Sequence, residues 1–143
     1  MKRTLGLTLL LFATLFSCMR QEKPLPAELS RAESVMWEHP DSALSILRSM
    51  PQSSLSSGKN YATWALLLAQ ARDKVYGKRL PDSLNIPFSD KLVQDAMDYF
   101  EKEGNLKRMA QTYYYKGQLL KDQKKITEAM PFFLKSKEMM TKL

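Results

Sequence analysis

The sequence contains very few of the residues that enzyme and metal sites usually depend on. It has one cysteine, one histidine and five glycines in 143 residues. A single cysteine cannot form an intramolecular disulfide, and His39 has no second histidine or nearby cysteine with which to bind a metal. No serine lies in a Gly-x-Ser-x-Gly elbow, and glycine is too scarce for a loop that cradles phosphate. We therefore expect a protein that is not an enzyme and that holds no metal or cofactor.

An apolar run long enough to cross a membrane is also missing. The run at residues 4–16 is shorter than the roughly 20 residues of a spanning helix, but it fits the roughly 7–15 residues of an export signal. Lys2 and Arg3 precede it, and Ser17 and Cys18 follow it. In this order the N-terminus resembles a bacterial lipoprotein signal. The resemblance implies a cleaved signal peptide (residues 1–17), a lipid on Cys18 and a lipidated tether (residues 18–26). An uncut signal anchor and a buried N-terminal helix are the alternatives.

The charge of the chain gives little indication of its partner. Loss of Lys2 and Arg3 with the signal would lower the formal net charge from +7 to +5. The remaining basic pairs are scattered between the expected helices, and export would separate the chain from the nucleic acid of the cell. We therefore expect no nucleic-acid binding.

Apolar residues recur at helical spacing along the whole mature chain, and no segment alternates with the period of two that is typical of a strand. Ser89 is a candidate N-cap with Phe88 and Val93 as a hydrophobic staple, and Gly104 is a candidate helix stop. Trp37 and Trp64 are expected in the core. The pattern predicts an all-α fold with six helices, near residues 29–36, 43–50, 61–75, 89–104, 106–120 and 126–141, and with loops at residues 50–60 and 77–87.

A short pattern occurs three times, in which an acidic residue is followed by Ala and, four places after the Ala, by Leu or Phe. Ala96 and Ala129 are 33 positions apart, close to the 34-residue period of tetratricopeptide repeats. The chain resembles this family best over residues 110–143. There the family's aromatic, small and large positions are occupied by Tyr113, Gly117, Leu120, Ala129, Phe133 and Ser136, whereas Lys116 and Pro131 depart from its pattern. The resemblance implies antiparallel helix pairs stacked as a short solenoid of about three repeats over residues 27–143.

In the resembling family, ligands usually lie along the concave face that the first helix of each pair forms. Carried onto residues 110–143, that face would include Gln111, Tyr114, Gln118 and Lys121, and would bind a protein or peptide. In the competing interpretation, Tyr114 packs on a neighbouring repeat and Lys121 is solvated. Asp73 and Asp95 are expected on different helices, where they cannot act together as acid and base.

The sequence therefore predicts a non-catalytic scaffold, anchored by lipid in the cell envelope, on the periplasmic or surface side of the outer membrane. An alternative is the sensory N-terminal part of a longer exported regulator, truncated at residue 143. The C-terminal helix has no polar closing helix after it, which repeat arrays normally need. A homo-oligomer formed through this helix is a further expectation.

Overall fold

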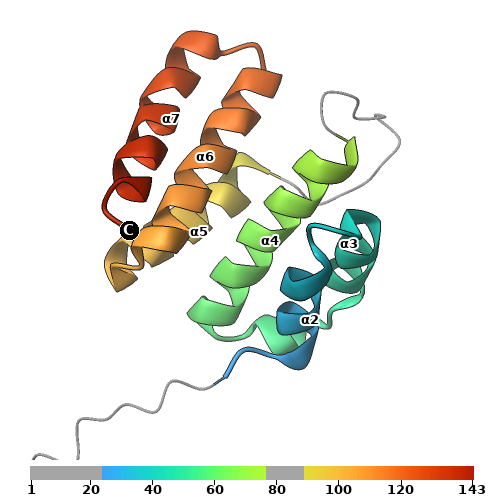
Figure 1. Ribbon diagram of the computed structural model, residues 1–143. Helices are drawn as coiled ribbons and strands as arrows, with labels where there is room; N and C mark the ends of the chain where they lie inside the picture. The colour runs from blue at the N-terminus through green and yellow to red at the C-terminus, as the bar shows by residue number, and fades with distance from the viewer. Residues whose placement is uncertain (1–23, 77–88) are drawn as a thin grey trace, which may run out of the picture.

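Every regular element is helical within the residues that the computed structural model describes, which are 24–76 and 89–143 (Figure 1). The expected signal, Cys18, the expected loop at residues 77–87 and Phe88 of the expected staple lie outside these ranges. No helix within them is long and apolar enough to span a membrane. The prediction of an all-α fold is confirmed for this part of the chain.

The first helix pair consists of α2 (Ala27–Val35) and α3 (Pro40–Ser49). Pro40 is the first residue of α3, where its missing N–H removes no hydrogen bond from the helix. His39 precedes it at the N-cap position, but its side chain makes no capping hydrogen bond. Apolar residues of both helices are fully buried, among them Leu29, Ala32 and Leu47.

The expectation that both tryptophans lie in the core is wrong for Trp37. Its side chain is 75% exposed, because α2 ends at Val35 and Trp37 lies in the turn beyond it. The ammonium group of Lys74 lies 3.2 Å from the centre of the Trp37 ring, so a cation–π contact covers part of the indole. Trp64 is buried as expected, and its Nε1–H donates to the carbonyl oxygen of Leu47 at 2.9 Å.

Helix α4 (Gly58–Tyr76) lies at the centre of the molecule. The loop before it is shorter than expected, because it contains the 3₁₀ helix η2 (Gln52–Leu55) and because α4 already begins at Gly58. Residues 62–71 are all buried, and α4 packs against α2, α3, α5 and α6. A helix that is apolar on nearly all sides requires such surroundings, as the sequence predicted.

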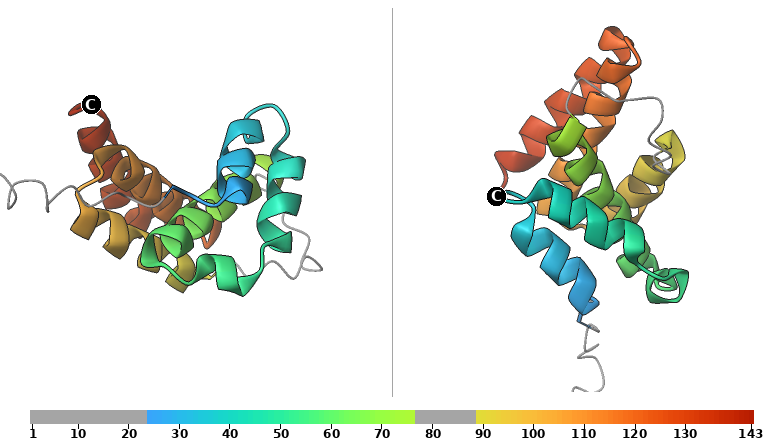
Figure 2. Two further views of the ribbon diagram at one scale, coloured as in Figure 1. Left: turned by 90° about the horizontal axis from the view of Figure 1, so that it is seen from below. Right: turned by 90° about the vertical axis from the view of Figure 1, so that its right-hand side faces the viewer.

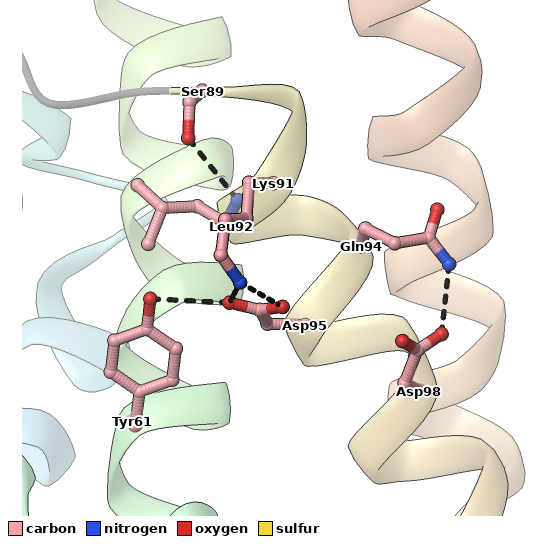
Figure 3. A network of polar contacts seen from close by, with 7 residues as sticks. All are labelled: Tyr61, Ser89, Lys91, Leu92, Gln94, Asp95 and Asp98. Atoms are coloured by element: carbon pink, nitrogen blue, oxygen red, sulfur yellow. Dashed lines mark hydrogen bonds and ion pairs between the residues drawn. The ribbon is translucent and has the colours of Figure 1, made fainter.

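Helix α5 (Asp90–Glu103) has the predicted caps. The Ser89 hydroxyl accepts a hydrogen bond from the backbone N–H of Leu92 at 3.3 Å (Figure 3). At the other end Gly104 has a φ of 75°, the left-handed conformation that glycine adopts without strain. On the surface of α5, Asp95 accepts hydrogen bonds from Lys91 at 2.8 Å and from the Tyr61 hydroxyl of α4 at 3.5 Å (Figure 3).

The last pair, α6 (Leu106–Asp122) and α7 (Ile126–Met140), packs closely and antiparallel. A Cβ atom placed on Gly117 would lie 2.7 Å from Cε1 of Phe133, so any larger residue at this crossing would force the Phe133 ring to shift. The Ser136 hydroxyl of α7 donates to the carbonyl oxygen of Ala110 at 2.7 Å. Lys116, where the family pattern has Leu, is buried, and its ammonium group lies 2.6 Å from Asp90 of α5.

Helices that follow one another in the chain pack against one another throughout. In addition, α4 packs against both α2 and α6, whereas the backbones of α2 and α6 do not contact each other. The left panel of Figure 2 shows α2 and α6 on either side of α4, with α3 and α7 farther out. The first helices of the three pairs therefore form one continuous side of the molecule, with α4 in the middle.

Candidate functional site

Three of the four predicted ligand-binding residues form one chain of hydrogen bonds on α6. The Lys121 ammonium donates to Oε1 of Gln118 at 3.1 Å. The Gln118 amide donates to the Tyr114 hydroxyl at 3.2 Å and to Oδ1 of Asp73 at 3.3 Å. Asp73 belongs to α4, so the cluster joins two of the helices that form the continuous side.

Gln111, the fourth predicted residue, belongs to a different network. Its Oε1 accepts a hydrogen bond from Arg108 at 3.5 Å. The same guanidinium group lies 2.8 Å from a carboxylate oxygen of Glu33 on α2. This ion pair connects α6 to α2 across α4, since the two helices have no backbone contact of their own.

Asp73 lies in surroundings that disfavour its charged form. Burial raises the pKa of the Asp73 carboxyl, and the nearby carboxylate of Asp122 raises it further. The Lys121 ammonium and the hydrogen bond from Gln118 oppose this shift. Asp122 in turn lies 3.9 Å from Arg72, whose pKa is lowered by burial.

The middle of this side holds two buried polar groups that the sequence analysis did not single out, Gln70 of α4 and Tyr115 of α6. Gln70 is 5% exposed and Tyr115 is 9% exposed. Within the described residues, neither the Gln70 amide nor the Tyr115 hydroxyl has a hydrogen-bond partner. In the described part of the chain, every side-chain nitrogen or oxygen that is fully shielded from solvent has a hydrogen-bond partner. Because these two groups have no partner there, they must keep some access to solvent.

Residue counting along α4 and α6 places Gln70 and Tyr115 at the same level of the two helices. Thr63 of α4 and Arg108 of α6 line the same pocket, and Asp73 of α4 accepts a hydrogen bond from Gln118 of α6. In both pairs the two residues are 45 positions apart in the sequence. Tyr115 and Gln70 are also 45 positions apart. Burial raises the pKa of Tyr115, with the Asp73 charge adding to the effect, so the phenol stays neutral and can both donate and accept a hydrogen bond.

We call this side the inner face and define it by six residues: Glu33, Gln70, Asp73, Arg108, Tyr115 and Gln118. A pocket opens at the end of the inner face nearest the α5–α6 turn. It is lined by Leu25, Lys59, Thr63, Phe100, Glu103, Gly104, Asn105 and Arg108.

The inner face offers neutral and charged hydrogen-bonding groups but no reactive constellation. Asp73 lies on α4 and Asp95 on α5, each with different partners, as the sequence predicted. In the described part of the chain, no group of three or more His, Cys, Asp or Glu side chains gathers as metal ligands do. The arrangement can bind a polar ligand through hydrogen bonds and single charges.

Sequence reasoning found the α6 side of the inner face but missed Gln70 of α4, Tyr115, and the pair formed by Glu33 and Arg108. One signal was present. Polar residues interrupt the apolar α4 at helical spacing, at Lys59, Thr63, Gln70 and Asp73. Such a stripe marks one face of a helix, and it would have identified α4 as the middle of the site.

No protein-family model, curated protein or solved structure matches the chain. Its function must therefore be inferred from the geometry of the inner face.

Proposed function

We propose that the protein is a non-catalytic, membrane-tethered scaffold of tetratricopeptide-repeat type that binds an extended peptide segment of a partner protein along its inner face. The observation that carries this proposal is the pair of buried groups at the middle of that face, Gln70 and Tyr115. Neither group has a hydrogen-bond partner within the described residues, but both keep some access to solvent. A ligand that covers them must therefore supply hydrogen bonds in place of that solvent, and an extended peptide can do so.

An extended peptide has the chemistry that these groups require. A glutamine amide and a tyrosine hydroxyl each donate and accept, and the backbone of an extended chain offers N–H and C=O groups in alternation. A helical partner uses those groups for its own hydrogen bonds and could not offer them. Lys121 and Arg108 lie near the two ends of the inner face and supply positive charge for acidic side chains or a terminal carboxylate of the peptide.

The packing of the helix pairs supports the repeat interpretation. Ala96 and Ala129, 33 positions apart, are 0% and 1% exposed at the second helix of their pairs. Gly117 leaves no room for a Cβ against Phe133, as the small position of a repeat requires. Stacked units of this kind form extended binding surfaces from the first helix of each pair.

The membrane tether belongs to the same proposal. A lipid on Cys18, followed by the proline-containing segment that leads to α2, would hold the helical domain at the envelope membrane with the inner face available to a partner outside the cytoplasm.

Selection from a random peptide library against the full chain in phosphatidylcholine vesicles tests the binding proposal. We expect enriched sequences that bind as extended chains, and we expect Gln70→Leu to weaken their binding about tenfold, because it removes one amide that bonds the ligand. Gln94→Leu on α5 is the matched control, because Gln94 bonds only Asp98 of its own helix at 2.8 Å (Figure 3). Equal loss in both variants, or no loss in Gln70→Leu with the helical circular dichroism intact, would contradict the proposal.

A further inference from the structure

The outer side of α7 carries an exposed apolar stripe. Ile126, Met130 and Leu134 lie four residues apart, on one side of the helix, and are 54%, 50% and 62% exposed. Lys137 lies within the same stripe by helical position and is also exposed. The stripe continues onto α6, because the ring of Phe133 lies 5.8 Å from that of Tyr114. We call Tyr114, Ile126, Met130, Phe133, Leu134 and Lys137 together the α7 surface.

In the preceding helix pair, the residues of α5 that correspond to Ile126 and Met130 are buried. Counting back 33 positions, Ile126 corresponds to Val93 and Met130 to Met97 of α5. Val93 is 2% exposed and Met97 is 7% exposed, and α5 packs against both α4 and α6. Among the described helices, α7 contacts α6 alone. At Ile126 and Met130 the α7 surface therefore has the apolar residues that α5 buries between its neighbours, whereas Leu134 corresponds to the exposed Glu101.

Charge distinguishes between the helices that could cover the α7 surface. A second copy of this chain, paired through its own α7, would bring Lys137 against a stripe made of apolar and threonine side chains, with no carboxylate to accept the ammonium group. Glu138 beside the stripe is already bonded to Lys142 at 2.6 Å. Burying Lys137 without a partner would cost free energy, so charge disfavours this pairing.

We propose that the α7 surface docks an amphipathic helix of a partner protein, one with acidic residues beside its apolar seam. The apolar seam would cover Ile126, Met130 and Leu134 as α6 covers α5, and a carboxylate would pair with Lys137. Recognition of this kind uses the side chains of a preformed helix and differs from backbone recognition at the inner face.

Binding of two labelled peptides to the full chain in phosphatidylcholine vesicles tests this inference by fluorescence anisotropy. Both peptides have about 18 residues, enough to form a helix, and share the same leucine seam, but one has glutamate and the other lysine beside the seam. We expect the glutamate peptide to bind about fivefold more tightly, since one ion pair contributes up to about 1 kcal/mol. Vesicles without protein provide the background.

Three variants decide where the glutamate peptide binds. Met130→Glu places a charge in the apolar stripe and should weaken binding at least about tenfold. Lys137→Glu should reverse the preference between the two peptides. Arg31→Glu, the same charge change on exposed α2, should leave the preference as it is. Met130 and Lys137 are exposed, so neither variant removes a core side chain.

Other outcomes would overturn the inference. Equal binding of both peptides, binding unchanged by Met130→Glu, or the same effect from Arg31→Glu as from Lys137→Glu would exclude specific docking at this surface. Efficient disulfide cross-linking between Met130→Cys chains in the vesicles, absent from the parent chain, would assign the α7 surface to a second copy. Failure of the inner-face proposal is measured separately, with Gln70→Leu and extended peptides.

Discussion

Gly117 and Phe133 show how a single missing side chain sets the distance between two helices. Because a Cβ on Gly117 would lie 2.7 Å from Phe133, α6 and α7 can keep this spacing with the Phe133 ring in place only where residue 117 is glycine. The sequence identified this position through the repeat pattern, and the structure supplies the physical reason.

We predict that Gly117→Ala destabilises the protein. In an exposed helix the same change would stabilise by about 1 kcal/mol, but overpacking at a tight crossing costs about 1–3 kcal/mol, so the net effect should be a lower free energy of unfolding in urea. Adding Phe133→Leu to Gly117→Ala should recover most of the loss. A chain with Gly117→Ala that is more stable than the parent would show that the crossing has room to spare.

The ion pair between the buried Lys116 and the exposed Asp90 leads to an asymmetric prediction. Asp90→Asn removes the charge that compensates a buried ammonium group and should lower the free energy of unfolding by about 1–3 kcal/mol. Lys116→Met removes the buried charge itself and should be neutral or stabilising, in line with the Leu of the family pattern. Urea unfolding of both variants measures the difference, and equal losses would mean that the pair itself stabilises the fold.

The raised pKa of Asp73 gives a prediction about pH. Since burial raises this pKa above its usual value of 3.8, the folded state binds more protons than the unfolded state, and stability falls as pH rises from 3.8 through the raised pKa. Asp73→Asn still accepts a hydrogen bond but carries no charge. We expect it to have a higher melting temperature than the parent at pH 7 and the same one near pH 3. A melting temperature that is lower at both pH values would assign Asp73 a stabilising role.

At the scale of the helices, the sequence predicted nearly everything that local signals control. All six expected helices were located to within a few residues, because capping residues and prolines determine where a helix begins or ends, and they lie close to that end in the sequence. The start of α4 and the 3₁₀ turn before it were missed, since Asn60 there bonds the backbone of Ser54, a contact that no periodicity indicates. The prediction that Trp37 is buried was wrong for a similar reason, because the exposure of its side chain depends on where α2 ends.

The caps of α5 and α6 should contribute measurably to stability. Asn105 caps α6 by accepting from the N–H of Arg108 at 3.1 Å, as Ser89 caps α5. We predict that Ser89→Ala and Asn105→Ala each lower the free energy of unfolding by about 0.5–2 kcal/mol. Ser45→Ala, at an exposed position inside α3, is the control and should change it by much less. Chemical denaturation measures all three, and an effect of Ser45→Ala as large as the others would argue against capping.

At the scale of the whole molecule, the candidate site was only half predictable from the sequence. Helical spacing placed Tyr114, Gln118 and Lys121 together on α6, and the structure confirms that they are joined. Their connection to Asp73 and the bond between Arg108 and Glu33 depend on how separate helix pairs stack. Residues 45 and 75 positions apart meet there, and a single sequence contains no signal for contacts at such distances.

The proposed lipid anchor would be a property of the whole molecule, and it can be tested directly. We predict that the mature protein begins at Cys18 with two or three acyl chains, and that Cys18→Ser releases the helical domain from the membrane fraction. Intact mass spectrometry and membrane fractionation provide the two measurements. An unmodified chain that still begins at Met1 would refute the anchor and the localisation that depends on it.

The bond between Arg108 and Glu33 also has a mechanical consequence. The first and last helix pairs do not touch through their backbones, so they are joined by their packing on the central pair and by this partly solvated ion pair, whose strength falls as salt concentration rises. The arrangement of the first and last helix pairs should therefore be more rigid at low salt concentration and more flexible at high salt concentration.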